Sequence, residues 1–203
     1  IDVRWRKKAI RQLAQKKPRT LLDVATGTAD VAIMASGILH PDKITGIDIS
    51  DGMLDMGRKK IQKLGLQDTI ELLNGDCETI NSDDNSFEAV TVAFGVRNFE
   101  NLEKGLLEIK RVLKPGGKLV VLEFSKPKMP VVKSMYNLYM KFICPYIGRV
   151  FSKNRTAYEY LDESIKQFPE GKTFTGILDN LGYKNTYSKP LSLGIFSIYC
   201  GEK

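Results

Sequence analysis

Residues 20–30 read TLLDVATGTAD, a short aliphatic run that leads directly into a turn of small residues. Such a run is typical of a strand that is buried on both faces of a sheet. Gly27 and its small neighbours would let a ligand approach the backbone where a helix begins. The stretch therefore predicts the first strand of an α/β sheet, with a ligand site at the carboxyl end of that strand.

The rest of the chain continues this alternation of strands and helices. Further apolar runs lie at residues 44–48, 69–73, 87–94 and 118–123, and helical patterns lie at residues 4–15, 31–39, 53–64, 102–113 and 173–181. The last two strand-like runs, residues 183–188 and 193–200, are too close together for a crossover and must be antiparallel. We predict a doubly wound, mostly parallel seven-stranded sheet of the Rossmann-like type, closed by a C-terminal antiparallel hairpin.

The composition bounds the kind of protein. With 203 residues and 42% hydrophobic residues, the chain can form one domain, residues 1–203, around a substantial core, which excludes intrinsic disorder. It has no uncharged apolar stretch near the roughly 18 residues that a membrane-spanning helix needs. Its three cysteines have no short spacing, so we expect no disulfide framework, no metal site and a cytoplasmic location.

The formal charge of +7 is unevenly distributed along the chain. Residues 126–155 contain seven basic side chains, five aromatic residues and no carboxylate. This pattern fits three structures: a solvated helix packed on the core, a surface that binds nucleic acid, or a helix on an anionic bilayer. We favour the third structure, a helix on an anionic bilayer, and we expect no binding of nucleic acid. We predict a helical lid over residues 126–170, inserted after the fifth strand, that contacts the inner face of the cytoplasmic membrane peripherally.

Carboxylates follow two further strands at the predicted ligand edge. Asp48, 21 residues after Gly27, can accept hydrogen bonds from the two hydroxyls of a ribose. Asp76 follows the third strand and could hold the exocyclic amine of adenine. Two alanines replace the glycines that a pyrophosphate would need, and Asp30 would repel phosphate. The edge therefore predicts a ligand with adenosine but no phosphate, namely S-adenosylmethionine.

Four strings carry a resemblance to a known family: DVATGTAD at residues 23–30, FGVRN at 94–98, RVLKPGG at 111–117 and EFSKP at 123–127. Together with YEYLDESI at 158–165, they resemble the ubiquinone/menaquinone biosynthesis C-methyltransferase family over essentially the whole chain. The third string is common among class I methyltransferases, whereas the second and fourth are more specific to the quinone enzymes. The resemblance implies S-adenosylmethionine-dependent C-methylation of a polyprenylated quinol ring.

The resemblance also implies that Thr28, Asp48, Asp76 and Cys77 bind the cofactor, beside Gly27. Two positions depart from the family pattern. Ala29 replaces the usual glycine, and Ala93 stands where some members have a serine, so we do not predict a cofactor contact there. Family members begin some tens of residues earlier, and we expect that segment to be missing here.

The implied reaction needs a ring carbon made nucleophilic by a deprotonated hydroxyl. We predict that Arg97 orients a water or stabilises the quinolate oxygen, and that Asn98 hydrogen-bonds the other ring oxygen. Alternatively, Arg97 pairs with a nearby carboxylate and Asn98 caps the following helix. Tyr158 and Tyr160 are predicted to border the pocket for the quinol ring. His40 precedes the second strand, at the opposite edge of the sheet, and is expected to be a surface residue.

Two other classes of function stay open. One is a methyltransferase for another small molecule or for RNA; the other is a catalytically silent S-adenosylmethionine-binding subunit of a quinone-synthesis complex. The combination of Asp48, Asp76 and Arg97 weighs against the second. The sequence does not decide between a menaquinone and a ubiquinone precursor, and it leaves open whether the chain forms a homodimer.

Overall fold

The computed structural model describes residues 2–127, 163–165 and 167–203. Most of the predicted lid, including Tyr158 and Tyr160, lies outside these residues, so the predictions for that segment stand untested. None of the helices in the described part of the chain has the length and apolar character to cross a membrane.

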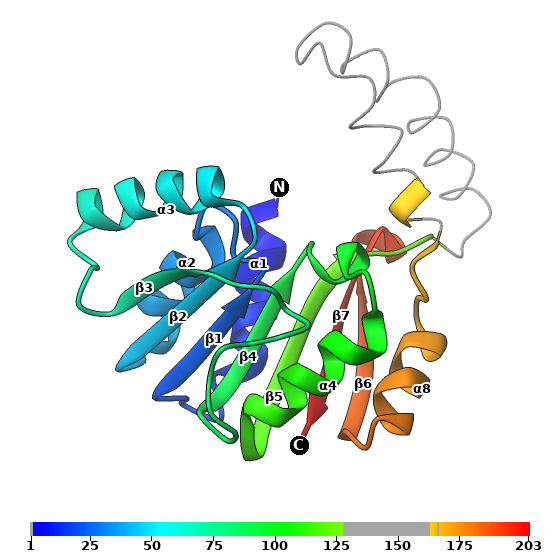
Figure 1. Ribbon diagram of the computed structural model, residues 1–203. Helices are drawn as coiled ribbons and strands as arrows, with labels where there is room; N and C mark the ends of the chain where they lie inside the picture. Colours follow the sequence, from blue (N-terminus) through cyan, green and yellow to red (C-terminus); the bar gives the residue numbers. More distant parts are fainter. Residues whose placement is uncertain (1, 128–162, 166) are drawn as a thin grey trace, which may run out of the picture.

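The described residues form a seven-stranded sheet in the order β3-β2-β1-β4-β5-β7-β6 (Figure 1). The strands are β1 (Thr20–Val24), β2 (Lys43–Asp48), β3 (Ile70–Asn74), β4 (Phe87–Ala93), β5 (Leu113–Phe124), β6 (Lys184–Leu191) and β7 (Phe196–Glu202). Strands β1 to β5 run parallel to one another, and β7 runs antiparallel to both β5 and β6. The predicted parallel sheet with a closing hairpin is therefore confirmed.

Helices cover both faces of the sheet (Figure 1). They are α1 (Asp2–Ile10), α2 (Asp30–Leu39), α3 (Asp51–Leu64), α4 (Leu102–Val112) and α8 (Lys172–Asn180), with short 3-10 helices at Arg11–Leu13, Val96–Asn98 and Ser192–Gly194. Buried side chains of α1, α2 and α3 belong to one hydrophobic cluster, and those of α4 and α8 to another. Each side of the sheet thus has its own core.

The strand β5 begins earlier than the sequence suggested. The strand was predicted at residues 118–123, but Leu113, which precedes the Pro-Gly-Gly turn of residues 115–117, already pairs with Phe87 of β4. The register shifts after that pair, and regular pairing resumes between Lys118 and Ala89. Gly116 takes a left-handed backbone, with φ of +75°, so the turn is accommodated as an irregularity inside the strand.

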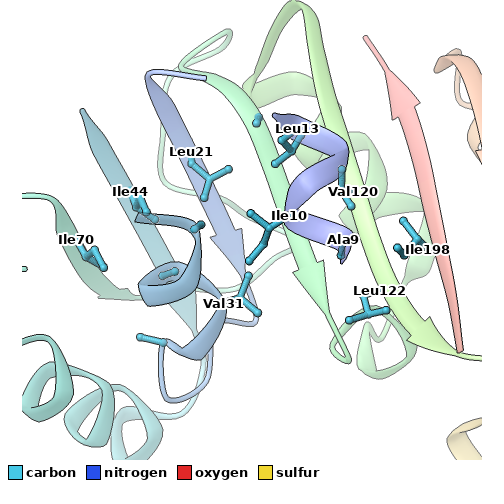
Figure 2. Packing of buried hydrophobic residues seen from close by; sticks show 14 of the residues in the cluster. Ala9, Ile10, Leu13, Leu21, Val31, Ile44, Ile70, Val120, Leu122 and Ile198 are labelled. Atoms are coloured by element: carbon cyan, nitrogen blue, oxygen red, sulfur yellow. The ribbon is translucent and has the colours of Figure 1, made fainter. Parts of the chain in front are cut away.

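Successive side chains of the central strands pack alternately into the two cores. Leu21 faces the cluster under α1, whereas Leu22 faces the cluster under α4. Figure 2 shows Ile10 and Leu13 directed at the sheet, with Leu21 of β1 on one side and Val120 of β5 on the other. Full burial of such a side chain stabilises the fold by about 1.5–3 kcal/mol. The segment that contains α1 is therefore firmly anchored on the sheet.

Candidate functional site

The loop after β1 is built from residues in the left-handed region. Ala25, Gly27 and Ala29 have φ values of +52°, +57° and +62°. Glycine adopts this region freely, whereas it costs an alanine roughly 1–2 kcal/mol. The loop folds back on itself through a hydrogen bond from the Ala29 N–H to the Thr26 carbonyl, at 3.0 Å. Its backbone is thereby turned toward the carboxyl end of the sheet.

Asp23 supports this loop from below. Its carboxylate is buried and accepts hydrogen bonds from the hydroxyls of Thr26 and Thr91, both at 2.6 Å. Burial raises the pKa of Asp23 to about 6, although both hydroxyls and the charge of Arg6 act in the opposite direction. The carboxylate connects β1, the loop and β4, and it fixes where the loop begins.

Asp48, at the end of β2, is held by backbone amides. Its Oδ2 accepts a hydrogen bond from the Gly27 N–H at 2.8 Å, and its Oδ1 accepts one from the Ser50 N–H at 2.9 Å. A carboxylate oxygen can accept two hydrogen bonds, so each oxygen can still bind a ligand hydroxyl. The structure therefore brings together Gly27 and Asp48 at one ligand edge, as the sequence predicted.

A cavity of about 270 Å³ opens between these elements. Its lining includes four of the predicted site residues, Gly27, Thr28, Asp48 and Asn98. It also includes residues that sequence reasoning did not assign to the site, among them Arg6, Met53, Ala93 and Phe94. The end of β4 was a signal for Ala93 and Phe94, whereas a basic residue on the first helix gave none. Exposed His40, at the opposite edge, is not part of this lining.

Asp76 and Cys77 follow β3 but are not among the residues that line this cavity. Asp76 accepts a hydrogen bond from the Glu78 N–H at 2.8 Å, which shapes the turn. Burial, together with the neighbouring carboxylates Asp76 and Glu78, raises the pKa of Cys77 to about 12. Its thiol is therefore protonated at neutral pH and is no nucleophile. The adenine contacts of both residues stay predictions.

Thr28 belongs to a charged cluster at one side of the cavity. The Nζ of Lys60 donates hydrogen bonds to the Thr28 hydroxyl at 2.8 Å and to Asp30 at 2.6 Å. The guanidinium of Arg6 lies 3.2 Å from the other oxygen of Asp30. Partial burial opposes the charge of Asp30, but Lys60 and Arg6 together hold its pKa below its usual value. Asp30 is therefore ionised and shared by two cations.

Arg97 and Glu123 form a buried ion pair at the ends of β4 and β5. The Nη1 of Arg97 lies 2.9 Å from a Glu123 oxygen, and the two side chains are only 11% and 0% exposed. Burial raises the pKa of Glu123, and the charge of Arg97 opposes that rise. Arg97 thus has the carboxylate partner considered above. Its Nε is buried without a hydrogen-bond partner among the described residues.

Asn98 does not cap the following helix. Asn101 takes that position, because its side chain accepts a hydrogen bond from the Lys104 N–H at 3.0 Å. Asn98 ends the preceding 3-10 helix and lies in the lining of the cavity. The capping alternative is therefore wrong, and Asn98 is part of the cavity wall instead.

An aromatic cluster lies beside the cavity. The ring of Phe94 is 5.1 Å from that of Phe124, which is 5.0 Å from that of Phe196, and Trp5 packs on Phe196 at 3.7 Å. Phe94 lines the cavity and takes a left-handed backbone, with φ of +61°, which is unusual for a bulky residue. The guanidinium of Arg97 lies 5.3 Å from the centre of the Phe124 ring. This wall is suited to a flat, electron-rich ring.

No group of three or more His, Cys, Asp or Glu residues in the described part of the chain could hold a metal ion. The arrangement consists of a polar cavity at the ends of β1 and β2, next to an apolar, cationic region at the ends of β4 and β5. It can place a small polar ligand beside an aromatic one.

A sequence model described as the ubiE/COQ5 methyltransferase family matches residues 1–203. The chain is 43% identical to a demethylmenaquinone methyltransferase of Bacteroides fragilis, over all of this chain and 83% of that protein. It is 41% identical to the ubiquinone/menaquinone biosynthesis C-methyltransferase UbiE of Geotalea daltonii, over all of this chain and 86% of that one.

Solved structures support the fold alone, because their sequence identity is low. An S-adenosylmethionine-dependent methyltransferase from Aquifex aeolicus aligns with a TM-score of 0.65 at 19% identity, covering 95% of this chain and 88% of that one. A putative methyltransferase from Bacillus halodurans aligns with a TM-score of 0.66 at 21% identity, covering 97% and 94%. These likenesses support the α/β fold described above.

Proposed function

The chain belongs to the ubiE/COQ5 methyltransferase family, and we propose that it binds S-adenosylmethionine in the cavity beside Gly27 and Asp48. Membership confirms the activity expected from the sequence, S-adenosylmethionine-dependent C-methylation in quinone biosynthesis. What we propose beyond this activity is which residues bind the cofactor and the substrate. The single observation that carries it is the position of Asp48, which lines the cavity and accepts a hydrogen bond from the Gly27 amide.

The chemistry of the cavity fits this cofactor. Three carboxylates, Asp23, Asp30 and Asp48, belong to its lining, which suits a ligand with a sulfonium and an ammonium group and disfavours phosphate. A Cβ on Gly27 would lie 3.3 Å from the end of the Met53 side chain and would be strained at φ of +57°. Because Gly27 has no Cβ, a nucleoside can approach the backbone of the loop closely, next to Met53.

When bound, S-adenosylmethionine supplies an activated methyl group on sulfur. The protein must align the accepting ring carbon with this methyl group and favour the quinolate, in which a ring hydroxyl has lost its proton. Arg97 supplies positive charge at the end of β4, and Glu123 fixes its orientation. The Nε of Arg97 is a buried donor without a partner among the described residues, which an ordered water would satisfy. Asn98, at the cavity, hydrogen-bonds the second ring oxygen, and the ring itself packs near Phe94.

We propose a polyprenylated quinol as the substrate, and demethylmenaquinol first, because relatives at 43% and 40% identity are named demethylmenaquinone methyltransferases. The test is methyl transfer from labelled S-adenosylmethionine to demethylmenaquinol, to a ubiquinone-pathway benzoquinol, or to tRNA. Label in a quinol supports the proposal. Label only in tRNA would overturn it, and cofactor binding without transfer to any acceptor would favour a silent subunit.

We also propose that residues 126–155 contact an anionic membrane, from which a water-insoluble polyprenyl substrate must be collected. The proposal rests on sequence, since seven basic residues accompany five aromatic ones in this segment. Each basic residue near such a surface contributes about 1 kcal/mol, and the attraction falls with added salt. Sedimentation with anionic vesicles should weaken for Lys133→Glu and Lys141→Glu but not for the control Lys63→Glu on α3. Equal sedimentation with neutral vesicles would contradict the proposal.

A further inference from the structure

Arg6 is the one Lys or Arg among the described residues that line the cavity, and the same lining contains three carboxylates. The amino-acid end of S-adenosylmethionine carries a carboxylate as well as an ammonium group. The ammonium can be balanced by the acidic lining, but the carboxylate needs a cation or amide donors when it leaves water. Asp48 is proposed to bind the ribose hydroxyls, so Arg6 is left to bind the carboxylate at the amino-acid end of the ligand.

The position of Arg6 is fixed by the fold. It lies on α1, one turn before the buried side chain of Ile10. Its side chain is only 18% exposed, with the guanidinium 3.2 Å from Asp30 and 5.8 Å from the centre of the Phe94 ring. An arginine carries five N–H donors in one plane and can bind a second carboxylate beside the first. Arg6 is thus oriented before any ligand arrives.

We propose that Arg6 binds the α-carboxylate of the methionine part of S-adenosylmethionine; this inference rests on the proposed cofactor site. The guanidinium then discriminates in favour of nucleosides that carry an intact amino-acid tail. The cluster around Asp30 supports this assignment, because Lys60 also pairs with Asp30, at 2.6 Å. Arg6 is therefore not the only cation that pairs with Asp30, and its guanidinium can bind a ligand carboxylate as well.

Lys60 provides a matched control. It pairs with the same carboxylate as Arg6, but it is not among the residues that line the cavity. Replacing Lys60 therefore changes the cluster without removing the proposed ligand contact. Arg6→Met removes the charge and keeps an apolar stem near Phe94, and Arg6→Lys keeps the charge without the planar fork.

The experiment is calorimetric titration of the full chain with two ligands, S-adenosylhomocysteine and 5′-methylthioadenosine, which lacks the amino-acid tail. Arg6→Met should weaken S-adenosylhomocysteine binding by about 10–100-fold, the value of a charge-assisted hydrogen bond. Its affinity for methylthioadenosine should change by less than about threefold. Arg6→Lys should recover part of the loss, and Lys60→Met should leave the ratio of the two affinities unchanged.

Three results would overturn the inference. If Arg6→Met lowers the affinity for both ligands equally, Arg6 only supports the loop. If it lowers neither affinity, Arg6 does not contact the ligand. If Lys60→Met changes the ratio of the two ligand affinities as much as Arg6→Met does, the effect belongs to Asp30, the shared partner. The proposed function fails separately, when the wild-type chain binds neither ligand. Thermal unfolding of each variant confirms that it is folded.

Discussion

The two halves of the ligand edge are stabilised in different ways. At β1 and β2, the carboxylate of Asp48 is held by the backbone amides of Gly27 and Ser50, and it keeps capacity for a ligand. At β4 and β5, the charge of Arg97 is held by a fully buried Glu123 beside packed aromatic rings. Backbone amides stay in place when a side chain is replaced, whereas a buried charge depends on its partner. The first half is therefore suited to bind and release a ligand, and the second to hold a charge rigidly.

The largest effect should come from breaking the buried pair. Glu123→Ala should lower the free energy of unfolding by about 3–5 kcal/mol, because Arg97 is left buried without its carboxylate. The measurement is denaturant unfolding. Asp55→Ala is the control, since it breaks the exposed Arg58–Asp55 pair and should cost less than about 1 kcal/mol. Similar losses in the two variants would mean that burial does not distinguish the pairs.

The second effect depends on pH and concerns Asp23, which supports the binding half. Its pKa is raised from 3.8 to about 6, so between these values the folded state holds more protons than the unfolded state. The stability contributed by the protonated form is complete below pH 3.8 and is lost as the pH rises to about 6. The loss should amount to about 3 kcal/mol.

Urea unfolding of the wild type and of Asp23→Asn between pH 3.5 and pH 8 measures this loss. The difference in stability between the two proteins should change across the acidic interval and stay constant above about pH 6.5. Parallel curves throughout would show that the Asp23 carboxylate is not perturbed by burial.

The smallest effect concerns the backbone of the loop. Ala25→Gly should raise the free energy of unfolding by about 0.5–1 kcal/mol, because φ of +52° is strained for alanine but not for glycine. The melting temperature should rise by about 2–4 °C per kcal/mol. Ala14→Gly is the control at an ordinary φ of −58° and should act in the opposite direction. A loss of stability in both variants would refute the strain.

The binding half could be predicted from sequence because its contacts follow from local pattern. An aliphatic run, a turn of small residues and a carboxylate after the next strand determine where Gly27 and Asp48 meet, since parallel strands end at one edge. The hairpin was equally predictable, because the short gap before the last strand forbids a crossover.

The other half depends on contacts between distant parts of the chain. The sequence offered a carboxylate partner for Arg97 as one alternative, but only the register of β4 and β5 identifies Glu123. The stacking of Trp5 on Phe196 joins the first helix to the last strand, which no local pattern reveals. The same packing of α1 brings Arg6 to the cavity. Asp76 was expected at that cavity, but the turn after β3 leaves it outside the lining.

We propose that residues at the ends of β1 and β2 bind the cofactor, whereas residues at the ends of β4 and β5 act on the substrate. It is tested most directly by the affinity for S-adenosylhomocysteine, measured by calorimetry in Asp48→Ala and Arg97→Lys, the latter retaining a charge beside Glu123. Asp48→Ala should weaken binding by roughly 2–3 kcal/mol, the loss of two charge-assisted hydrogen bonds. Arg97→Lys should bind within about threefold of the wild type while its turnover of quinol falls at least about tenfold. Unchanged affinity in Asp48→Ala, or an equal loss in Arg97→Lys, would contradict the claim.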